Sequence, residues 1–120
     1  YLLNKDFLPS TDIIKLSLVK SYLKTNQIDA LNRSKKLLEE MLHNNPKWSL
    51  LWRLLAKTSG KLGKKGISYI ALAEEALIKK NFIKAKKYVD IANKQPGLPI
   101  TYKLRGTDIL NRIKLKYKKK

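Results

Sequence analysis

The side chains that could support catalysis or metal binding are few and widely separated. His43 is the single histidine, and the chain has no cysteine. One imidazole without thiolates cannot supply the ligands of a zinc site, so we expect His43 to act only as a favourable charge at a helix end. No serine has an identifiable base beside it, as a nucleophile requires. We therefore expect no catalytic residues, no metal ligands and no cofactor in this chain.

Three cations are better placed to bind a ligand by charge. Arg53, Lys57 and Lys61 recur at every fourth position, which places them on one stripe of a helix. Such a stripe could hold an acidic peptide through charge-assisted hydrogen bonds. Trp48, at the start of the same segment, is a candidate anchor for a partner, or else a structural residue. The alternative for the stripe is that it arises by chance in a lysine-rich chain.

The formal net charge of +18 raises the question of nucleic-acid binding, because clustered basic residues release counterions from phosphates. Only four of the 27 basic residues are arginine, the side chain that forks onto phosphates and guanine edges. The arginines are Arg33, Arg53, Arg105 and Arg112. Lysines spread along every segment favour a solvated basic surface, so a protein or peptide is the preferred partner and nucleic acid the less favoured one.

Length and apolar content predict one folded domain. The chain has 120 residues, of which 43% are hydrophobic. No apolar run approaches the roughly 20 residues that span a bilayer, so we expect a soluble protein. The sequence begins with Tyr1, and YLLNKDFL reads like the end of an earlier element. We expect the chain to be a fragment of a longer protein.

Apolar residues recur at intervals of three and four throughout, which predicts an all-α protein. Turn residues divide the chain into six expected helices, at about residues 10–25, 29–44, 47–62, 66–80, 82–94 and 99–116. Gly63 suits the left-handed position after the third helix, and Asn81 is the expected joint between the fourth and fifth. Because the turns are short, consecutive helices must run antiparallel. The result is either a bundle or a solenoid.

Small residues at fixed positions favour the solenoid. Large and small side chains follow the spacing of the roughly 34-residue tetratricopeptide repeat at Tyr69, Leu72, Ala73, Ala76, Phe82, Ala85, Val89 and Ala92. A second register led by Trp52, Leu55 and Ala56 fits nearly as well, so the fourth helix can serve as either member of a pair. A small residue admits the bulk of a neighbouring helix, so hairpins can stack closely. We expect a right-handed, tetratricopeptide-like solenoid.

Short motifs in the second half of the chain also carry a resemblance to a particular family. They are Trp52-Leu55-Ala56, Gly60-Leu62-Gly63, Ala71-Leu72-Ala73-Glu74-Ala76-Leu77, Ala85, and Leu104-Arg105-Gly106-Thr107-Asp108-Ile109. Together they resemble the C-terminal tetratricopeptide region of bacterial BepA-like zinc metallopeptidases. Ser59, Asn81 and Gly106 depart from the Tyr, Gly and Ala usual in that family.

The resemblance implies a function for the chain as part of a larger enzyme. Members of the family carry an N-terminal HExxH domain that binds zinc, and that domain is absent here. The chain would then be the repeat tail of a periplasmic metallopeptidase in outer-membrane protein quality control. It would recruit substrates or outer-membrane assembly components. The alternatives are a stand-alone, cytoplasmic tetratricopeptide adaptor and a basic helical-repeat protein that binds nucleic acid.

Overall fold

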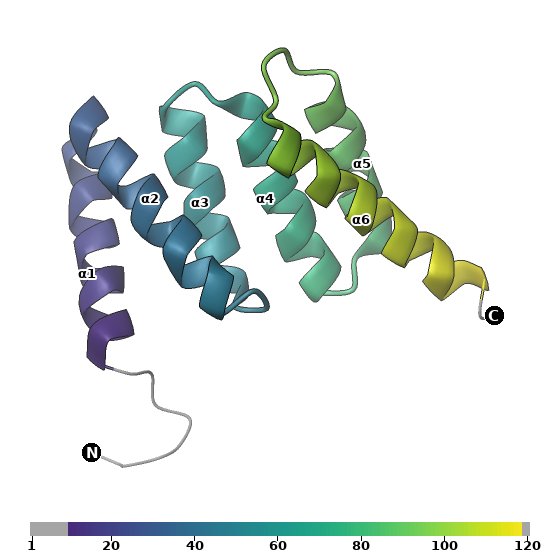
Figure 1. Ribbon diagram of the computed structural model, residues 1–120, viewed down its shortest axis with the longest axis horizontal. Helices are drawn as coiled ribbons and strands as arrows, with labels where there is room; N and C mark the ends of the chain where they lie inside the picture. Colours follow the sequence, from purple (N-terminus) through teal and green to yellow (C-terminus); the bar gives the residue numbers. More distant parts are fainter. Residues whose placement is uncertain (1–9, 119–120) are drawn as a thin grey trace.

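The computed structural model describes residues 10–118, which form six α-helices and no strand (Figure 1). The helices are α1 (Ser10–Thr25), α2 (Ile28–Asn44), α3 (Ser49–Lys61), α4 (Lys65–Ile78), α5 (Phe82–Asn93) and α6 (Ile100–Lys118). The predicted all-α class with about six helices is confirmed. Tyr1 and the YLLNKDFL segment, on which the expectation of a fragment was based, lie outside the described residues.

Local backbone chemistry explains where the helices end. Gly63 follows α3 with a φ of 77°, in the left-handed region that glycine adopts readily. Lys80 takes a φ of 61° after α4, so this helix ends at Ile78 and not at residue 80 as predicted. Asn81 caps α5, since its side chain accepts a hydrogen bond from the backbone N–H of Lys84. Helix α3 starts at Ser49, two residues later than predicted, because Trp48 has an extended backbone.

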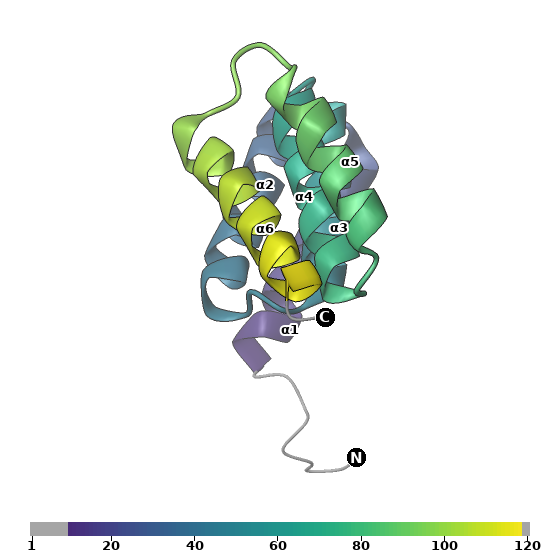
Figure 2. The same cartoon turned by 90° about the vertical axis from the view of Figure 1, so that its right-hand side faces the viewer.

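The helices form two layers around α4. Each helix packs against the next one along the chain, and α4 also contacts α6. Figure 2 shows α2 and α6 on one side of the molecule, α3 and α5 on the other, and α4 between them. Helix α4 therefore has neighbours on several sides. Stacking as a tetratricopeptide solenoid stays a prediction.

The core has two clusters that meet at α4. The first is built mainly from α1, α2 and α3 and includes Leu38, Leu51 and Trp52. The second joins α4, α5 and α6 and includes Ile70 and Ile109. Alanines of α4 contribute to both clusters, Ala71 to the first and Ala73 with Ala76 to the second. Tyr102 of α6 packs against both and so joins the two halves of the core.

The small residues singled out in the sequence lie inside this core. Ala73, Ala85, Val89 and Ala92 have no exposed surface, and Ala56 and Ala76 are buried. Of the large residues in the pattern, Trp52 and Leu55 are buried, while Tyr69, Leu72 and Phe82 are partly buried at the edges of the clusters. Small side chains thus lie where α4, α5 and α6 approach one another.

Replacing Ala73 with leucine should destabilise the fold by about 1–3 kcal/mol, because the added atoms have no space in the second cluster. Urea denaturation followed by circular dichroism measures the loss. Ile83→Leu on α5, at a side chain that is 78% exposed, is the matched control and should change stability by less than about 0.5 kcal/mol. Equal stability of the Ala73→Leu protein and the wild type would contradict the packing described here.

None of the six helices in residues 10–118 combines the length and the apolar character needed to cross a bilayer.

Candidate peptide-binding groove

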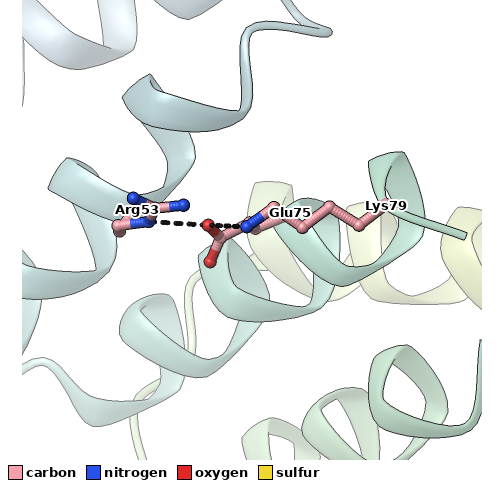
Figure 3. Close-up of polar contacts among 3 residues, drawn as sticks. All are labelled: Arg53, Glu75 and Lys79. Atoms are coloured by element: carbon pink, nitrogen blue, oxygen red, sulfur yellow. Dashed lines mark hydrogen bonds and ion pairs between the residues drawn. The ribbon is translucent and has the colours of Figure 1, made fainter. Parts of the chain in front are cut away.

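The cationic stripe predicted as a binding surface lies on α3, and its first residue contacts α4. Arg53 Nε lies 2.7 Å from Glu75 Oε2, and Lys79 Nζ lies 3.1 Å from the same oxygen (Figure 3). Partial burial would raise the pKa of Glu75, but hydrogen bonds from Arg53 and Lys79 outweigh it and hold the pKa below its ordinary value. Arg53 is therefore engaged in holding α3 to α4.

The end of the stripe makes a second intramolecular contact. Lys61 Nζ donates hydrogen bonds to the Leu23 carbonyl oxygen, at 3.3 Å, and to the side-chain oxygen of Asn26. These contacts tie the end of α3 to the turn between α1 and α2. Lys57 is exposed between the two ends. Two of the three stripe residues thus have partners within the chain, which weakens the interpretation of the stripe as a free acidic-peptide site.

Replacing Glu75 with glutamine should destabilise the fold by about 0.5–1 kcal/mol at pH 7, because two cations lose their shared partner. A lowered pKa contributes stability above the ordinary value of 4.5, and this contribution is lost as the pH falls through the folded-state pKa. The difference from wild type should therefore shrink toward pH 3 in urea titrations. Asp108→Asn, which removes the exposed pair with Arg112, is the control and should have a smaller effect. A deficit independent of pH would show that packing, not charge, is lost.

The two tryptophans have different environments. Trp48 precedes α3 and is half-buried against the first core cluster. Trp52 is only 2% exposed, and its Nε1–H donates to the carbonyl oxygen of Pro46 at 2.7 Å. The Arg105 guanidinium lies 4.8 Å from the centre of the Trp52 ring, within the range of a cation–π contact. Trp52 thus links α3, the α2–α3 turn and α6.

One hollow lies away from the α3 stripe, between α4, α6 and the α2–α3 turn. Its volume is about 580 Å³. The apolar lining comes from α4, the start of α5, α6 and the turn: Leu77, Ile78, Phe82, Leu115 and Pro46. The charged lining comprises five basic and two acidic residues: Lys47, Lys80, Arg105, Arg112, Lys116, Glu74 and Asp108. We call this hollow the α4–α6 groove.

Both carboxylates of the α4–α6 groove have arginine partners. Glu74 Oε2 lies 2.7 Å from Arg105 Nη1, and Asp108 Oδ2 lies 3.0 Å from Arg112 Nε. Burial raises the pKa of Glu74 above its ordinary value, and the hydrogen bond and charge of Arg105 offset this only in part. The Asp108–Arg112 pair joins two exposed side chains one turn apart on α6. Arg105, whose side chain is 43% exposed, reaches the buried carboxylate of Glu74 from the surface of α6.

Two further hollows continue the same face toward α2. One, of about 200 Å³, lies between α2 and α6 with Trp52 in its lining and includes exposed His43; it shares Arg105 with the α4–α6 groove. The other, of about 620 Å³, shares Glu39 and Tyr102 with the hollow between α2 and α6. The Tyr102 hydroxyl donates a hydrogen bond to Glu39 and so bridges α6 and α2, and burial followed by this carboxylate raises the pKa of Tyr102. The α2, α4 and α6 face is therefore hollowed along its length.

The residues that matter most on this face were missed by sequence reasoning. Arg105, Tyr102 and Glu74 were not among the candidate binding residues, which were Arg53, Lys57, Lys61 and Trp48. Glu74 could have been recognised from the sequence, because the spacing of the apolar residues in α4 places it on the side of the helix that faces the core. A buried carboxylate needs a cation, and few arginines are available.

Within residues 10–118, no group of three or more His, Cys, Asp or Glu side chains could hold a metal ion. No protein-family model, no curated protein and no solved structure matches this chain. The function of the chain must therefore be inferred from its own residues, among them those of the α4–α6 groove.

Proposed function

We propose that this chain is a protein-interaction module whose α2, α4 and α6 face holds a peptide segment of a partner protein. The α4–α6 groove is the observation that carries the proposal. Its volume of about 580 Å³ falls in the usual range of ligand sites, roughly 300–1,000 Å³. An apolar floor beside charged side chains resembles the grooves in which peptides dock by apolar anchors. Both groove carboxylates are paired with arginine, so we assign the site a binding role and no catalytic step.

The finer proposal is that the module is the C-terminal tetratricopeptide tail of a periplasmic zinc metallopeptidase of the BepA-like type. Its support is the motif resemblance, together with the burial of the residues that define it, such as Trp52, Leu55 and Ala73. In this proposal the zinc is held by a separate HExxH domain, and the tail recruits substrates or outer-membrane assembly components. The coding sequence upstream of Tyr1 tests it: an HExxH motif there supports the parent enzyme, and a start codon directly upstream overturns it.

Selection from a library of random peptides tests the binding role. Peptides of about 12 residues extend to roughly 40 Å, long enough to cover the groove. Selected peptides should bind the full chain with dissociation constants on the order of 1–100 μM and should shift the amide resonances of Leu77, Ile78 and Leu115. Failure to select any peptide overturns the proposal. Resonance shifts confined to Arg53, Lys57 and Lys61 would show that the peptide binds the α3 stripe and not the α2, α4 and α6 face.

Leu115→Ser and Ile83→Ser form a matched pair for this test. Both side chains are largely exposed, at 60% and 78%, but only Leu115 lines the α4–α6 groove. Leu115→Ser should weaken binding about tenfold, as expected for one lost apolar contact, and Ile83→Ser should leave it unchanged. Equal effects of the two substitutions would place the binding site elsewhere.

A further inference from the structure

The floor of the α4–α6 groove is apolar and mainly aliphatic. Leu77 and Ile78 of α4 are partly buried, and Leu115 of α6 stands 60% exposed opposite them. Phe82 closes one part of the floor and is held edge-on by Tyr117, with ring centres 6.3 Å apart. A large apolar side chain of a ligand could cover Leu115 and the partly buried residues beside it at once, and this would remove the most apolar surface from water. The floor therefore favours a ligand with at least one large apolar side chain.

The rim of the same groove carries cations from three separate elements. Lys47 comes from the α2–α3 turn, Lys80 from the α4–α5 turn and Lys116 from α6. All three are exposed, and none makes an ion pair with another side chain of residues 10–118. Glu74 and Asp108, the carboxylates that could neutralise them, are already paired with Arg105 and Arg112. The groove thus keeps unbalanced positive charge around an apolar floor.

From this juxtaposition we infer that the α4–α6 groove binds acidic peptide segments in which a large apolar residue is flanked by aspartate or glutamate. The inference rests on the proposed binding function and names the chemistry of the partner. The apolar anchor covers Leu77, Ile78 and Leu115, and the flanking carboxylates meet the lysines of the rim. Unlike the α3 stripe, whose Arg53 is bound to Glu75, these lysines lie beside an apolar surface and make no ion pair within residues 10–118.

Nucleic acid is a poorer match to the same residues. Single strands bind where bases stack on aromatic rings along a basic track. The groove floor presents Leu77, Ile78 and Leu115, which have no flat face for a base, and Phe82 is the single aromatic side chain that residues 10–118 contribute to the lining of this groove. A phosphate backbone would satisfy the rim lysines but would leave the aliphatic floor against polar groups.

Fluorescence anisotropy with three labelled peptides tests the inference on the full chain. The first peptide has two leucines flanked by glutamates, the second replaces the glutamates with glutamine, and the third replaces the leucines with serine. We expect the first to bind about tenfold or more tightly than either of the others, and to weaken as NaCl rises from about 0.05 to 0.3 M. Lys116→Glu should weaken binding of the first peptide about tenfold, while Lys87→Glu, on the exposed surface of α5, should change it less than about twofold.

The outcomes separate this inference from the broader binding role. If the glutamine peptide binds as tightly as the glutamate peptide, or if the random library yields peptides without acidic residues that still depend on Leu115, the charge preference is wrong and the binding function stands. If neither the designed peptides nor the library yields a binder, both fail. If a labelled oligothymidine binds more tightly than the acidic peptide and loses affinity in Lys116→Glu, the groove serves nucleic acid and the inference is overturned.

Discussion

Replacing Trp52 with alanine should lower the free energy of unfolding by about 3–5 kcal/mol. The ring is 2% exposed and lies in the first core cluster, so its removal leaves a large cavity among tightly packed side chains. The substitution also removes the hydrogen bond to the Pro46 carbonyl and the surface on which Arg105 rests. Urea denaturation followed by far-UV circular dichroism measures the change, since this signal comes mainly from the helical backbone.

Two control substitutions separate these contributions. Trp52→Phe keeps much of the apolar bulk but cannot donate to Pro46, so it should cost less than the alanine substitution, about 1–3 kcal/mol. Trp48→Ala removes a half-buried ring of the same size and should also cost less than Trp52→Ala. A Trp52→Ala protein that is destabilised by less than about 1 kcal/mol would contradict its assignment as the link between α3, the α2–α3 turn and α6.

The predictions that proved accurate were those of helices and turns, which depend on residues close in sequence. The period of apolar residues predicted six helices, and glycine or asparagine at positions 63 and 81 predicted two of the turns, because these features act within a few residues. Helix ends differed where a residue took an unexpected backbone conformation. Lys80 adopts the left-handed region although it is not glycine, so α4 ends before the predicted position.

The binding face was not predictable in the same way, because it depends on which helices lie side by side. Residues 46 and 116 line one groove only because the α2–α3 turn, α4 and α6 lie together, and a pattern of residues close in sequence does not reveal this. The α3 stripe could be recognised since its members are four residues apart. Its contacts with Glu75 and Asn26, from other helices and turns, could not. The sequence also left two repeat registers open, and α4 packs against α3, α5 and α6.

Replacing Arg105 with alanine should destabilise the fold by about 2–4 kcal/mol at pH 7, because it leaves the Glu74 carboxylate buried without a partner. Protonation of Glu74 limits the penalty. Keeping a carboxyl protonated costs about 1.4 kcal/mol for each pH unit above its ordinary pKa of 4.5, so a neutral Glu74 at pH 7 costs roughly 3 kcal/mol. Loss of the guanidinium from the Trp52 ring adds a smaller amount, about 0.5–1 kcal/mol at a side chain that is 43% exposed.

The pH dependence distinguishes this electrostatic cause from a loss of packing. A carboxyl whose folded-state pKa is raised contributes most stability below its unfolded pKa, and that stability is lost as the pH rises through the folded-state value. Removing Arg105 raises the pKa of Glu74 further, so the deficit of the Arg105→Ala protein should be largest near pH 7 and smallest near pH 4 in urea titrations. Adding Glu74→Gln should recover most of the deficit at pH 7, since the amide carries no charge to bury. If the deficit is as large near pH 4 as near pH 7, and Glu74→Gln does not reduce it, then Arg105 acts mainly through its contact with Trp52. Glu74 would in that case be neutral in the folded protein even with its arginine present.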